Sequence, residues 1–301
     1  MIKTLVIGLG KVSLSNNITK NNLSLATHCG SLLHKKNFKI VGAVEKKNIP
    51  IKIFKSFFSC TCFTSIQKAL KKTEPNLIVI ATPTQSHLQI TKEILSNRSK
   101  NLKAVLFEKP VGLGLKQIYR IKKICQNKRI KIFVNYSRDY EKAFIKFSTF
   151  FLKSSFYNAE VSYNGGFINN ASHFISLFII FFGQIRSFNI LKKKRINNDF
   201  SIKCILYFKK CRLVLKNNNT KKFNSFYIKC KNKKLISYSN ITESIFFHKK
   251  NFYKKIKNNL KKGHLNVYNE IENFFFKRKY VVCSLSKAYY IHQVINKCIN
   301  S

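Results

Sequence analysis

Lys109 is the residue whose surroundings point most clearly to chemistry. It follows the apolar run 105–107 and Glu108, and Pro110 comes next. Most other lysines stand beside Asn, Lys or other polar residues, as solvated surface lysines do. In an open α/β sheet, ligands bind outside the carboxyl ends of the strands, and burial there can bring the pKa of a lysine into a useful range for proton transfer. Position alone leaves two interpretations, a proton-transfer group or a lysine that merely caps a strand.

A glycine turn near the start of the chain is the second candidate. Gly8 and Gly10 follow the first apolar segment, and Ser13 takes the position of a third glycine. The first glycine permits a tight turn, and the second lets the backbone approach a pyrophosphate at a helix N-terminus. Glu45 ends the next strand, and its carboxylate suits the ribose hydroxyls of NAD, although Lys46 and Lys47 leave NADP open. The interval from Gly10 to Glu45 exceeds the usual spacing of about 20 residues, which predicts an insertion.

A proline turn after another apolar segment is the third candidate. Thr82 and Pro83 end the segment 77–81, and His87 follows. Lys109 also stands at a proline turn after a strand, so we predict that His87 and Lys109 lie beside the same cleft.

The segments that must position these residues alternate between two types. Strands are predicted at 3–7, 38–44, 77–81, 104–107 and 130–134, and helices at 21–35, 64–72, 86–96 and 115–127. This alternation is typical of βαβ units with a parallel, doubly wound sheet. After residue 140, strands at 158–163, 200–208, 211–216, 225–231 and 235–238 follow one another through short turns, which favours an antiparallel sheet. Helices are expected near 170–182, 265–276 and 285–299.

We therefore expect an α/β protein with two domains. Residues 1–135 would form the dinucleotide-binding domain, and residues 136–301 an α+β domain for substrate and oligomer contacts. The sequence leaves open whether a terminal helix packs back on the first domain.

The net charge of +46 is the most conspicuous feature of the composition. A strongly basic chain can bind nucleic acid. Here the excess is spread along the chain and comes with many Asn, Ile and Phe, all encoded by A/T-rich codons, so we favour genome bias. The runs 192–195 and 249–262 are the two remaining candidates for basic patches. A nucleic-acid-binding protein is the least favoured hypothesis because the chain has no recognised binding motif.

Cysteine usage and hydropathy limit the remaining classes. The 9 cysteines include no Cys-x-x-Cys pair, so we expect free thiols in a reducing compartment and no metal site. The longest apolar run, 174–182, is far shorter than the roughly 20 residues that span a bilayer. No signal peptide is recognised at the N-terminus. These features predict a soluble, cytoplasmic protein without membrane contact.

Taken together, the segments resemble the Gfo/Idh/MocA family of NAD(P)-dependent oxidoreductases. The matching pieces are Gly8-Leu9-Gly10, Ala81-Thr82-Pro83 with His87, Glu108-Lys109-Pro110, Asn135-Tyr136-Ser137-Arg138, and the segment 165–173 that ends at His173. Their order fits over nearly the whole chain. The resemblance implies a Rossmann domain followed by a domain with a large open sheet, and a homo-oligomer, either a dimer or a tetramer.

The resemblance also implies roles for individual residues. Lys109 would be the catalytic lysine, and His173 would contact the reacting hydroxyl. The remaining roles concern two ligands. NAD, with NADP not excluded, would be held by Gly8, Gly10, Lys11, Val12, Glu45, Thr82, Pro83, His87 and Glu108. The substrate, a sugar or sugar nucleotide, would contact Tyr136, Arg138, Asn169 and Asn170.

Two positions depart from the family pattern. Many members carry an aspartate four residues before the histidine and another three after it, where this chain has Asn169 and Ser176. We expect Lys109 and His173 to suffice for hydride transfer to or from a sugar hydroxyl, and the variant segments suggest a role in surface polysaccharide synthesis. The alternative is a dinucleotide-binding protein of the same fold without catalytic activity.

Overall fold

The computed structural model describes residues 1–14, 23–97, 100–126, 128–151, 156–218, 223–230, 233–239, 244–249, 252–257 and 263–301. The chain divides into two compact units. Unit 1 consists of Met1–Ser137 and Lys261–Tyr289, and unit 2 of Arg138–Leu260 and Tyr290–Ser301. A segment near the C-terminus thus belongs to unit 1. No helix in the described parts of the chain is both long and apolar enough to cross a membrane.

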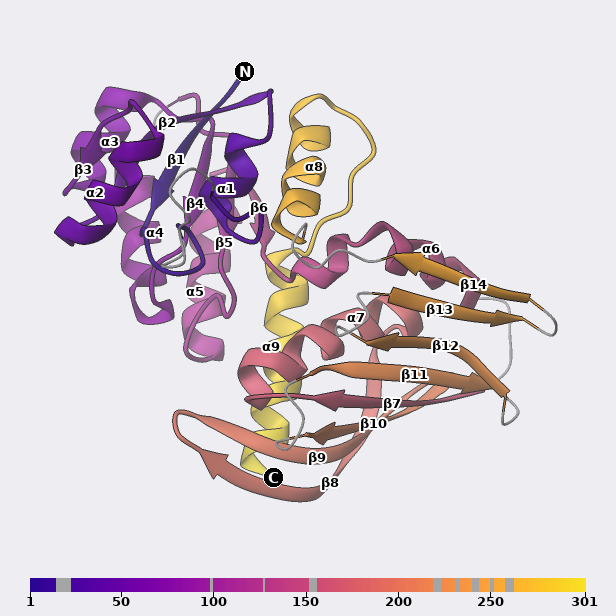
Figure 1. Cartoon of the computed structure of the whole chain (residues 1–301). Helices are drawn as coiled ribbons and strands as arrows, with labels where there is room; N and C mark the ends of the chain where they lie inside the picture. The colour runs from indigo at the N-terminus through magenta and orange to yellow at the C-terminus, as the bar shows by residue number, and fades with distance from the viewer. Residues whose placement is uncertain are drawn as a thin grey trace. The chain divides into compact units, whose positions relative to one another are not determined.

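Unit 1 is built on a six-stranded parallel sheet (Figure 1). Its strands are β1 (Ile2–Ile7), β2 (Phe38–Val44), β3 (Cys62–Phe63), β4 (Leu77–Ile80), β5 (Ala104–Phe107) and β6 (Lys131–Val134). Their order is β3-β2-β1-β4-β5-β6, which confirms the predicted doubly wound fold. All residues of β4 and β5 are buried, as expected for parallel strands covered on both faces. The order reverses between β1 and β4, and ligands bind beyond the carboxyl ends of strands at such a point.

Six α-helices lie wholly within the described residues of this unit. They are α1 (His28–Leu33), α2 (Asn48–Phe57), α3 (Ile66–Thr73), α4 (His87–Ser96), α5 (Leu115–Gln126) and α8 (Gly263–Phe275). In α3, Ile66, Ala69 and Leu70 are buried at helical spacing, and the Ser65 side chain caps the first turn through the amide of Lys68. The sequence analysis did not predict α2, which buries only Phe54.

The first helix is shorter than predicted, and the reason is an insertion. The sequence suggested a helix over 21–35, but α1 begins at His28. The amides of His28 and Cys29 donate to the carbonyls of Val12 and Ser13, at 3.1 and 2.9 Å. In a continuous helix, each amide bonds to the carbonyl four residues earlier. Here each partner lies twelve residues further back, so twelve extra residues lie between the two. Without those twelve residues, Gly10 and Glu45 would be 23 positions apart, close to the usual spacing. The expected insertion therefore lies before α1.

Unit 2 contains an eight-stranded sheet with one parallel pairing. Its strands are β7 (Tyr157–Tyr163), β8 (Ile185–Ile196), β9 (Asp199–Phe208), β10 (Cys211–Asn217), β11 (Ser225–Cys230), β12 (Lys233–Ser239), β13 (Ser244–Lys249) and β14 (Phe252–Lys257). The order is β14-β13-β12-β11-β7-β10-β9-β8. All neighbours are antiparallel except β7 and β10, which confirms the mainly antiparallel sheet.

One face of this sheet carries an aromatic core. The helices α6 (Lys142–Phe151) and α7 (Ser172–Phe182) belong to this unit, together with the end of α9 (Leu285–Asn300). Phe144, Phe174 and Phe178 place their rings 5.8, 6.3 and 5.8 Å from that of Phe226 on β11. Burial alternates along β7 and β10, as expected for a sheet with one covered face.

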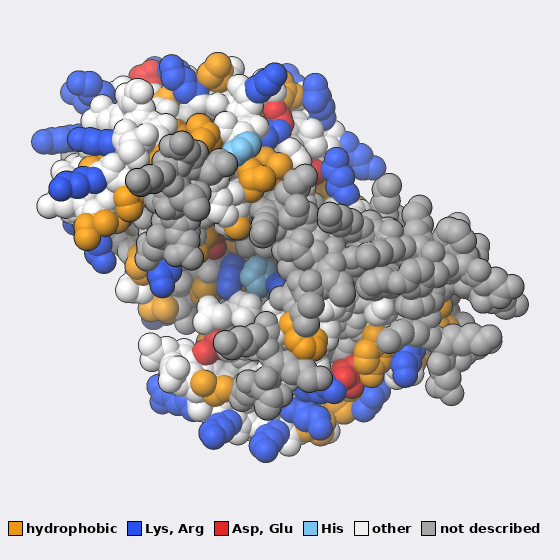
Figure 2. Space-filling model, in the orientation of Figure 1, with side chains coloured by type: hydrophobic (Ala, Val, Ile, Leu, Met, Phe, Trp, Pro, Cys, Tyr) orange, Lys and Arg blue, Asp and Glu red, His pale blue; other side chains and the backbone are white. Residues whose placement is uncertain are grey.

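The basic residues are distributed over the surface. Lys192–Arg195 lie on the edge strand β8 and are all exposed. Lysines on an edge strand oppose pairing with another sheet, so this run has a structural explanation. The other predicted run, 249–262, lies partly outside the described residues. On the face in Figure 2, Lys and Arg side chains are scattered rather than gathered in one patch.

Candidate functional site

The glycine turn lies at the carboxyl end of β1, beside the neighbouring strands. Gly8 has a φ of 91°, and a Cβ there would lie 2.8 Å from Thr82 Cγ2 and 2.9 Å from the carbonyl oxygen of Ala81. Only glycine fits both the backbone angle and the space. A Cβ at Gly10 would meet no atom within 4 Å. The first glycine therefore permits the turn, and the second leaves open space for a ligand. Lys11 and Val12 have exposed side chains.

Glu45 is bound to this turn. Its Oε2 accepts a hydrogen bond from the amide of Leu9 at 2.9 Å, and its Oε1 accepts from the amides of Lys46 and Lys47 at 2.8 and 3.1 Å. Burial raises the pKa of Glu45, but these bonds and the Lys47 charge outweigh burial and lower the pKa overall. A carboxylate has about four acceptor positions, so one remains for a ribose hydroxyl.

The turn after β4 is held by His87. Its Nε2 lies 3.0 Å from the carbonyl oxygen of Thr82 and its Nδ1 3.1 Å from that of Val111. The ring is fully buried, and burial lowers the pKa of His87. Both nitrogens thus face backbone within unit 1. His87 joins the loops that carry Pro83 and Pro110, which makes it a positioning residue for the site.

Glu108, at the end of β5, is the centre of a side-chain network. Its Oε1 contacts His28 Nε2 at 2.8 Å and accepts a hydrogen bond from Asn135 Nδ2. His264 Nε2 lies 3.8 Å from the same oxygen and 3.1 Å from Asn135 Nδ2. The hydroxyl of Tyr268 contacts His28 Nδ1 at 2.8 Å. Residues from α1, β5, the end of β6 and α8 therefore converge on one carboxylate.

The network keeps Glu108 ionised. Burial raises the pKa of Glu108, but the bonds and charges of His264 and His28 outweigh it and bring the pKa far below its usual range. Burial, followed by repulsion from His264, lowers the pKa of His28, and Glu108 only partly offsets this. The cluster therefore pairs an anionic carboxylate with a neutral His28 ring at neutral pH.

Lys109 follows directly and is half-buried. Its amide donates to Glu108 Oε2 at 3.2 Å, and the peptide bond to Pro110 is cis. The carboxylate of Glu108 thus fixes the backbone from which the lysine side chain projects. The sequence analysis did not identify His28 or His264. The insertion hid His28 by moving it away from the glycine turn, and His264 has no recognisable motif around it.

The predicted substrate residues begin at the end of unit 1. Tyr136 is buried, and its amide donates to the carbonyl of Val134 at 2.8 Å. In unit 2, Arg138 places its guanidinium carbon 4.5 Å from the centre of the Phe174 ring. Burial lowers the pKa of Arg138, and Tyr238 partly offsets that effect.

In unit 2, the turn before α7 is held by Asp199, a residue that the sequence analysis missed. The turn is the π-helical segment η3 (Phe167–Ala171). Asp199 Oδ1 accepts from the amide of Ile168 at 2.9 Å, and Oδ2 accepts from the amide and the side-chain Nδ2 of Asn169, both at 3.0 Å. A Cβ at Gly166 would collide with this carboxylate. Asn170 Nδ2 donates to the carbonyl of Asn164 at 2.6 Å. The nitrogens of both predicted amides are therefore already hydrogen-bonded.

A second carboxylate lies against α7. Ser176 Oγ contacts Oδ1 and Oδ2 of Asp139 at 2.9 and 2.7 Å. Asp139 follows Arg138 in the short helix η2 (Ser137–Tyr140) and is buried. His173, one turn before Ser176, is also buried. Where the family pattern has aspartates, this chain thus has Asn169 and Ser176 bound to aspartates from elsewhere.

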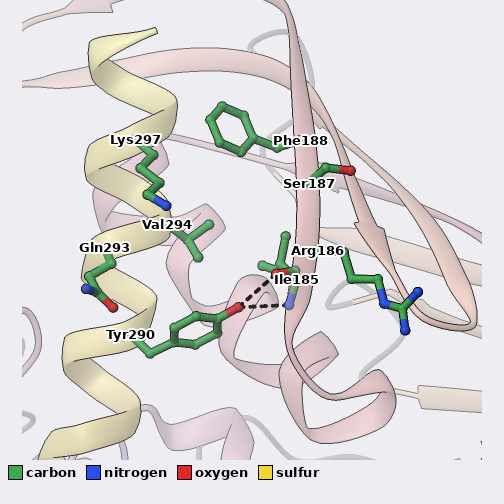
Figure 3. A pocket seen from close by; sticks show the side chains of 8 residues that line it. All are labelled: Ile185, Arg186, Ser187, Phe188, Tyr290, Gln293, Val294 and Lys297. Atoms are coloured by element: carbon green, nitrogen blue, oxygen red, sulfur yellow. Dashed lines mark hydrogen bonds between the residues drawn. The ribbon is translucent and has the colours of Figure 1, made fainter.

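Unit 2 also has a cavity without any predicted site residue. Its volume is about 370 Å³, and it lies between the start of β8 and α9 (Figure 3). The Tyr290 hydroxyl accepts from the amide of Ile185 at 2.8 Å and donates to its carbonyl at 3.2 Å. Lys297 and Gln293 also line the cavity, while Arg186 points away from α9. This region fastens a helix to an edge strand.

Comparison with solved structures supports the fold. A dehydrogenase (MviM) from Clostridium difficile is 16% identical with a TM-score of 0.77, covering 99% of both chains. An oxidoreductase from Agrobacterium radiobacter, in complex with NAD+, L-tartaric acid and magnesium, is 11% identical with a TM-score of 0.78, covering 100% of this chain and 96% of its own. The super-repressor mutant of Gal80p from Saccharomyces cerevisiae is 13% identical with a TM-score of 0.82, covering 99% and 95%. At these identities the likeness concerns the fold.

Sequence comparison identifies the family. No curated protein matches the chain. Residues 2–136 match the model of the oxidoreductase family with an NAD-binding Rossmann fold, GFO_IDH_MocA. The match covers the glycine turn, Glu45, His87 and the Glu108-Lys109-Pro110 segment, and it confirms the resemblance and the NAD-type cofactor. Residues 2–136 of this chain therefore belong to the Gfo/Idh/MocA family of NAD-binding oxidoreductases.

Proposed function

We propose that the protein is an NAD(P)-dependent oxidoreductase that transfers a hydride between the nicotinamide and a hydroxyl or keto group of a sugar or sugar nucleotide. One observation carries the proposal. The glycine turn with Glu45 and the Glu108-Lys109 segment lie at the carboxyl edge of the same parallel sheet, on strands beside its reversal point. This is the edge where such folds bind dinucleotides.

The residues present suit a dinucleotide. Gly10 leaves space for close approach, and Glu45 retains an acceptor position for a ribose hydroxyl. Lys46 and Lys47 are exposed beside Glu45 and would suit the 2′-phosphate of NADP, so the proposal covers both cofactors. Thr82, Pro83 and Glu108 would line the nicotinamide end, with His87 holding their loops in place.

Lys109 is proposed as the proton-transfer residue. When bound, the nicotinamide accepts or donates the hydride, and the protein must move the hydroxyl proton. During oxidation, the neutral amine of Lys109 would take the proton of the substrate hydroxyl as its C–H hydride leaves. A positioned acid–base group contributes about 10²–10⁴ in rate. His173 would contact the same hydroxyl, as the family resemblance implies.

The proposed substrate class follows from charge and from the segment around α7. The chain carries a net charge of +46, which attracts anionic ligands such as the diphosphate of a sugar nucleotide. Arg138 and Tyr136 would face the substrate. The side-chain nitrogens of Asn169 and Asn170 each already donate one hydrogen bond, and the amide oxygens are proposed to accept from sugar hydroxyls. A role in surface polysaccharide synthesis is part of this proposal.

Cofactor binding and turnover test the proposal separately. Purified protein should show a thermal shift with NADH or NADPH, and it should oxidise or reduce at least one member of a sugar-nucleotide panel, followed by nicotinamide absorbance. Lys109→Ala should keep the thermal shift and lose at least about a hundredfold in turnover. Lys103→Ala, which removes an exposed lysine from the start of the same strand region, is the matched control. The proposal fails if neither cofactor shifts the melting temperature.

A second function is favoured by one observation. Asn169 and Ser176 replace two carboxylates of the family pattern, so a dinucleotide-binding protein without catalysis is the alternative. It predicts the thermal shift with NADH or NADPH but no turnover of any sugar nucleotide, in the wild type as in Lys109→Ala. Turnover that depends on Lys109 would exclude this alternative.

Two further parts of the proposal concern assembly and location. We propose a homo-oligomer, a dimer or tetramer, which light scattering on the eluted protein would measure. A cytoplasmic location is proposed as well, and fractionation of the source cells would test it.

A further inference from the structure

We propose that His28, Glu108 and His264 form a binding site for a divalent transition-metal ion such as Zn²⁺. One nitrogen of each histidine and one carboxylate oxygen lie within 4.8 Å of one another. Two histidines and one carboxylate are a common ligand set for zinc. The three residues are far apart in sequence, in α1, after β5 and in α8, so no motif spacing reveals them. For this reason the sequence analysis predicted no metal.

The two distances from the carboxylate to the histidines suit an ion. Zinc lies about 2.0–2.1 Å from histidine nitrogens and about 2.0–2.2 Å from carboxylate oxygens, which in a tetrahedral site puts ligand atoms about 3.3 Å apart. Glu108 Oε1 is 2.8 Å from His28 Nε2 and 3.8 Å from His264 Nε2. These two separations lie on either side of the required value. The ligand nitrogens of His28 and His264 lie within 4.8 Å of each other, so binding would draw these two rings together by up to about 1.5 Å.

The outer contacts are those of a ligating histidine. A metal-bound histidine commonly uses its other nitrogen to hold a fixed partner, which sets the ring orientation. His28 Nδ1 is 2.8 Å from the Tyr268 hydroxyl, so Nε2 is the nitrogen turned toward the cluster. The amide of Lys109 holds the second oxygen of Glu108 at 3.2 Å. Two of the three ligands are thus oriented before any ion arrives.

Asn135 provides an independent reason to place an ion here. Its Nδ2 faces both Glu108 Oε1 and His264 Nε2, while its Oδ1 is buried without a hydrogen-bond partner. Burying an unpaired amide oxygen is unfavourable. Rotating the amide by 180° would turn Oδ1 toward Glu108 Oε1 and His264 Nε2, where a bound cation would offset the repulsion between the two oxygens. The ion would then have two nitrogen and two oxygen ligands.

An ion can reach the ligands. The side chains of Glu108 and His264 are 13% and 16% exposed, while that of His28 is fully buried. An ion can therefore enter on the side of Glu108 and His264.

The test uses the untagged full chain, stripped with EDTA and dialysed. Calorimetry should show one Zn²⁺ bound per chain, with weaker binding toward acid pH. Co²⁺ should give a visible d–d absorption band that Zn²⁺ abolishes. The chain has 9 cysteines, so the near-ultraviolet band of a cobalt–thiolate bond is recorded in the same spectra.

His264→Gln is the main variant, because its partly exposed side chain can be replaced with little effect on folding. It should weaken Zn²⁺ binding by at least about tenfold and reduce the cobalt band. His34→Gln removes an exposed histidine that contacts only the Gly30 carbonyl of its own helix, and it should bind Zn²⁺ as the wild type does. Asn135→Leu, which removes the amide oxygen, should weaken binding as well.

Three results would overturn the proposal. They are no stoichiometric uptake of Zn²⁺ by the wild type, equal affinity in His264→Gln and His34→Gln, or a cobalt–thiolate band that places the ion on cysteines. In each case the cluster would be a hydrogen-bond network that only positions Glu108. Binding of NADH is measured on the same samples, so failure of the metal site and failure of the proposed oxidoreductase remain distinguishable.

Discussion

The two units hold their carboxylates in different ways. In unit 1, Glu45 and Glu108 stand at the ends of strands, within the short motifs that identify them, and their partners gather around them. In unit 2, Asp199 and Asp139 come from outside the segment that they support and bind Asn169 and Ser176. Functional residues at strand ends can be recognised from short sequence motifs. A contact that depends on a residue far away in the sequence cannot be recognised in this way.

The largest expected change in the free energy of unfolding tests whether unit 2 depends on the carboxylate of Asp199. Asp199 is 7% exposed and accepts from Ile168, Asn169 and Phe200. Asp199→Ala leaves several buried donors without a partner and should lower the free energy of unfolding by about 3 kcal/mol. Denaturant titration followed by circular dichroism measures this. Glu160→Ala, which removes a partly exposed ion pair with Lys216 on the same sheet, should cost less than about 1 kcal/mol, and equal losses would contradict the prediction.

Exchanging the charges of Asn169 and Asp199 tests whether the two side chains depend on each other. Asn169→Asp restores the residue of the family pattern but places a second carboxylate against Asp199 Oδ2, where the Asn169 Nδ2 now donates at 3.0 Å. Like charges at that distance should destabilise the protein by about 2 kcal/mol. Adding Asp199→Asn should restore most of the loss. A double-mutant cycle on melting temperature measures the coupling, and additive losses would show that the two positions are independent.

Some elements and residues could be predicted from the sequence, and others could not. The strands β1, β2, β4, β5 and β6 were predicted because buried parallel strands are nearly continuous apolar runs. The helix α6 and the long edge strand β8 were not predicted, and the lysines of β8 resemble those of a solvated loop. Glu108 and Lys109 were found from their motif. Asp199 was missed because its role depends on a partner thirty positions earlier in the chain.

The stability of unit 1 should depend on pH through His28. Burial lowers the pKa of His28 from 6.5, so the unfolded chain binds more protons below that pH than the folded one. Stability should therefore fall as pH drops from about 6.5, by up to about 1.4 kcal/mol per pH unit. Hydrogen exchange followed on peptides covering α1 in unit 1, and α7 in unit 2 for comparison, measures the slope. His28→Gln should flatten it, and an unchanged slope in that variant would refute the assignment.

The smallest effect belongs to the cavity of unit 2. Tyr290→Phe removes two hydrogen bonds to Ile185 at the start of β8. It should lower stability by about 1 kcal/mol and leave cofactor binding unchanged. Thermal melting with and without NADH tests both parts. A loss of cofactor binding in this variant would contradict the prediction, because it would mean that the edge strand influences the dinucleotide site.

The separation of thirty positions between Asn169 and Asp199 has a consequence for the order of folding. The turn before α7 is bonded to Asp199, the first residue of β9, which is reached only after α7 and the whole of β8. Contacts between distant residues form after the intervening loop has closed. We therefore expect the turn before His173 to be completed late, once the hairpin of β8 and β9 has paired. Slowing that hairpin should delay the formation of this turn.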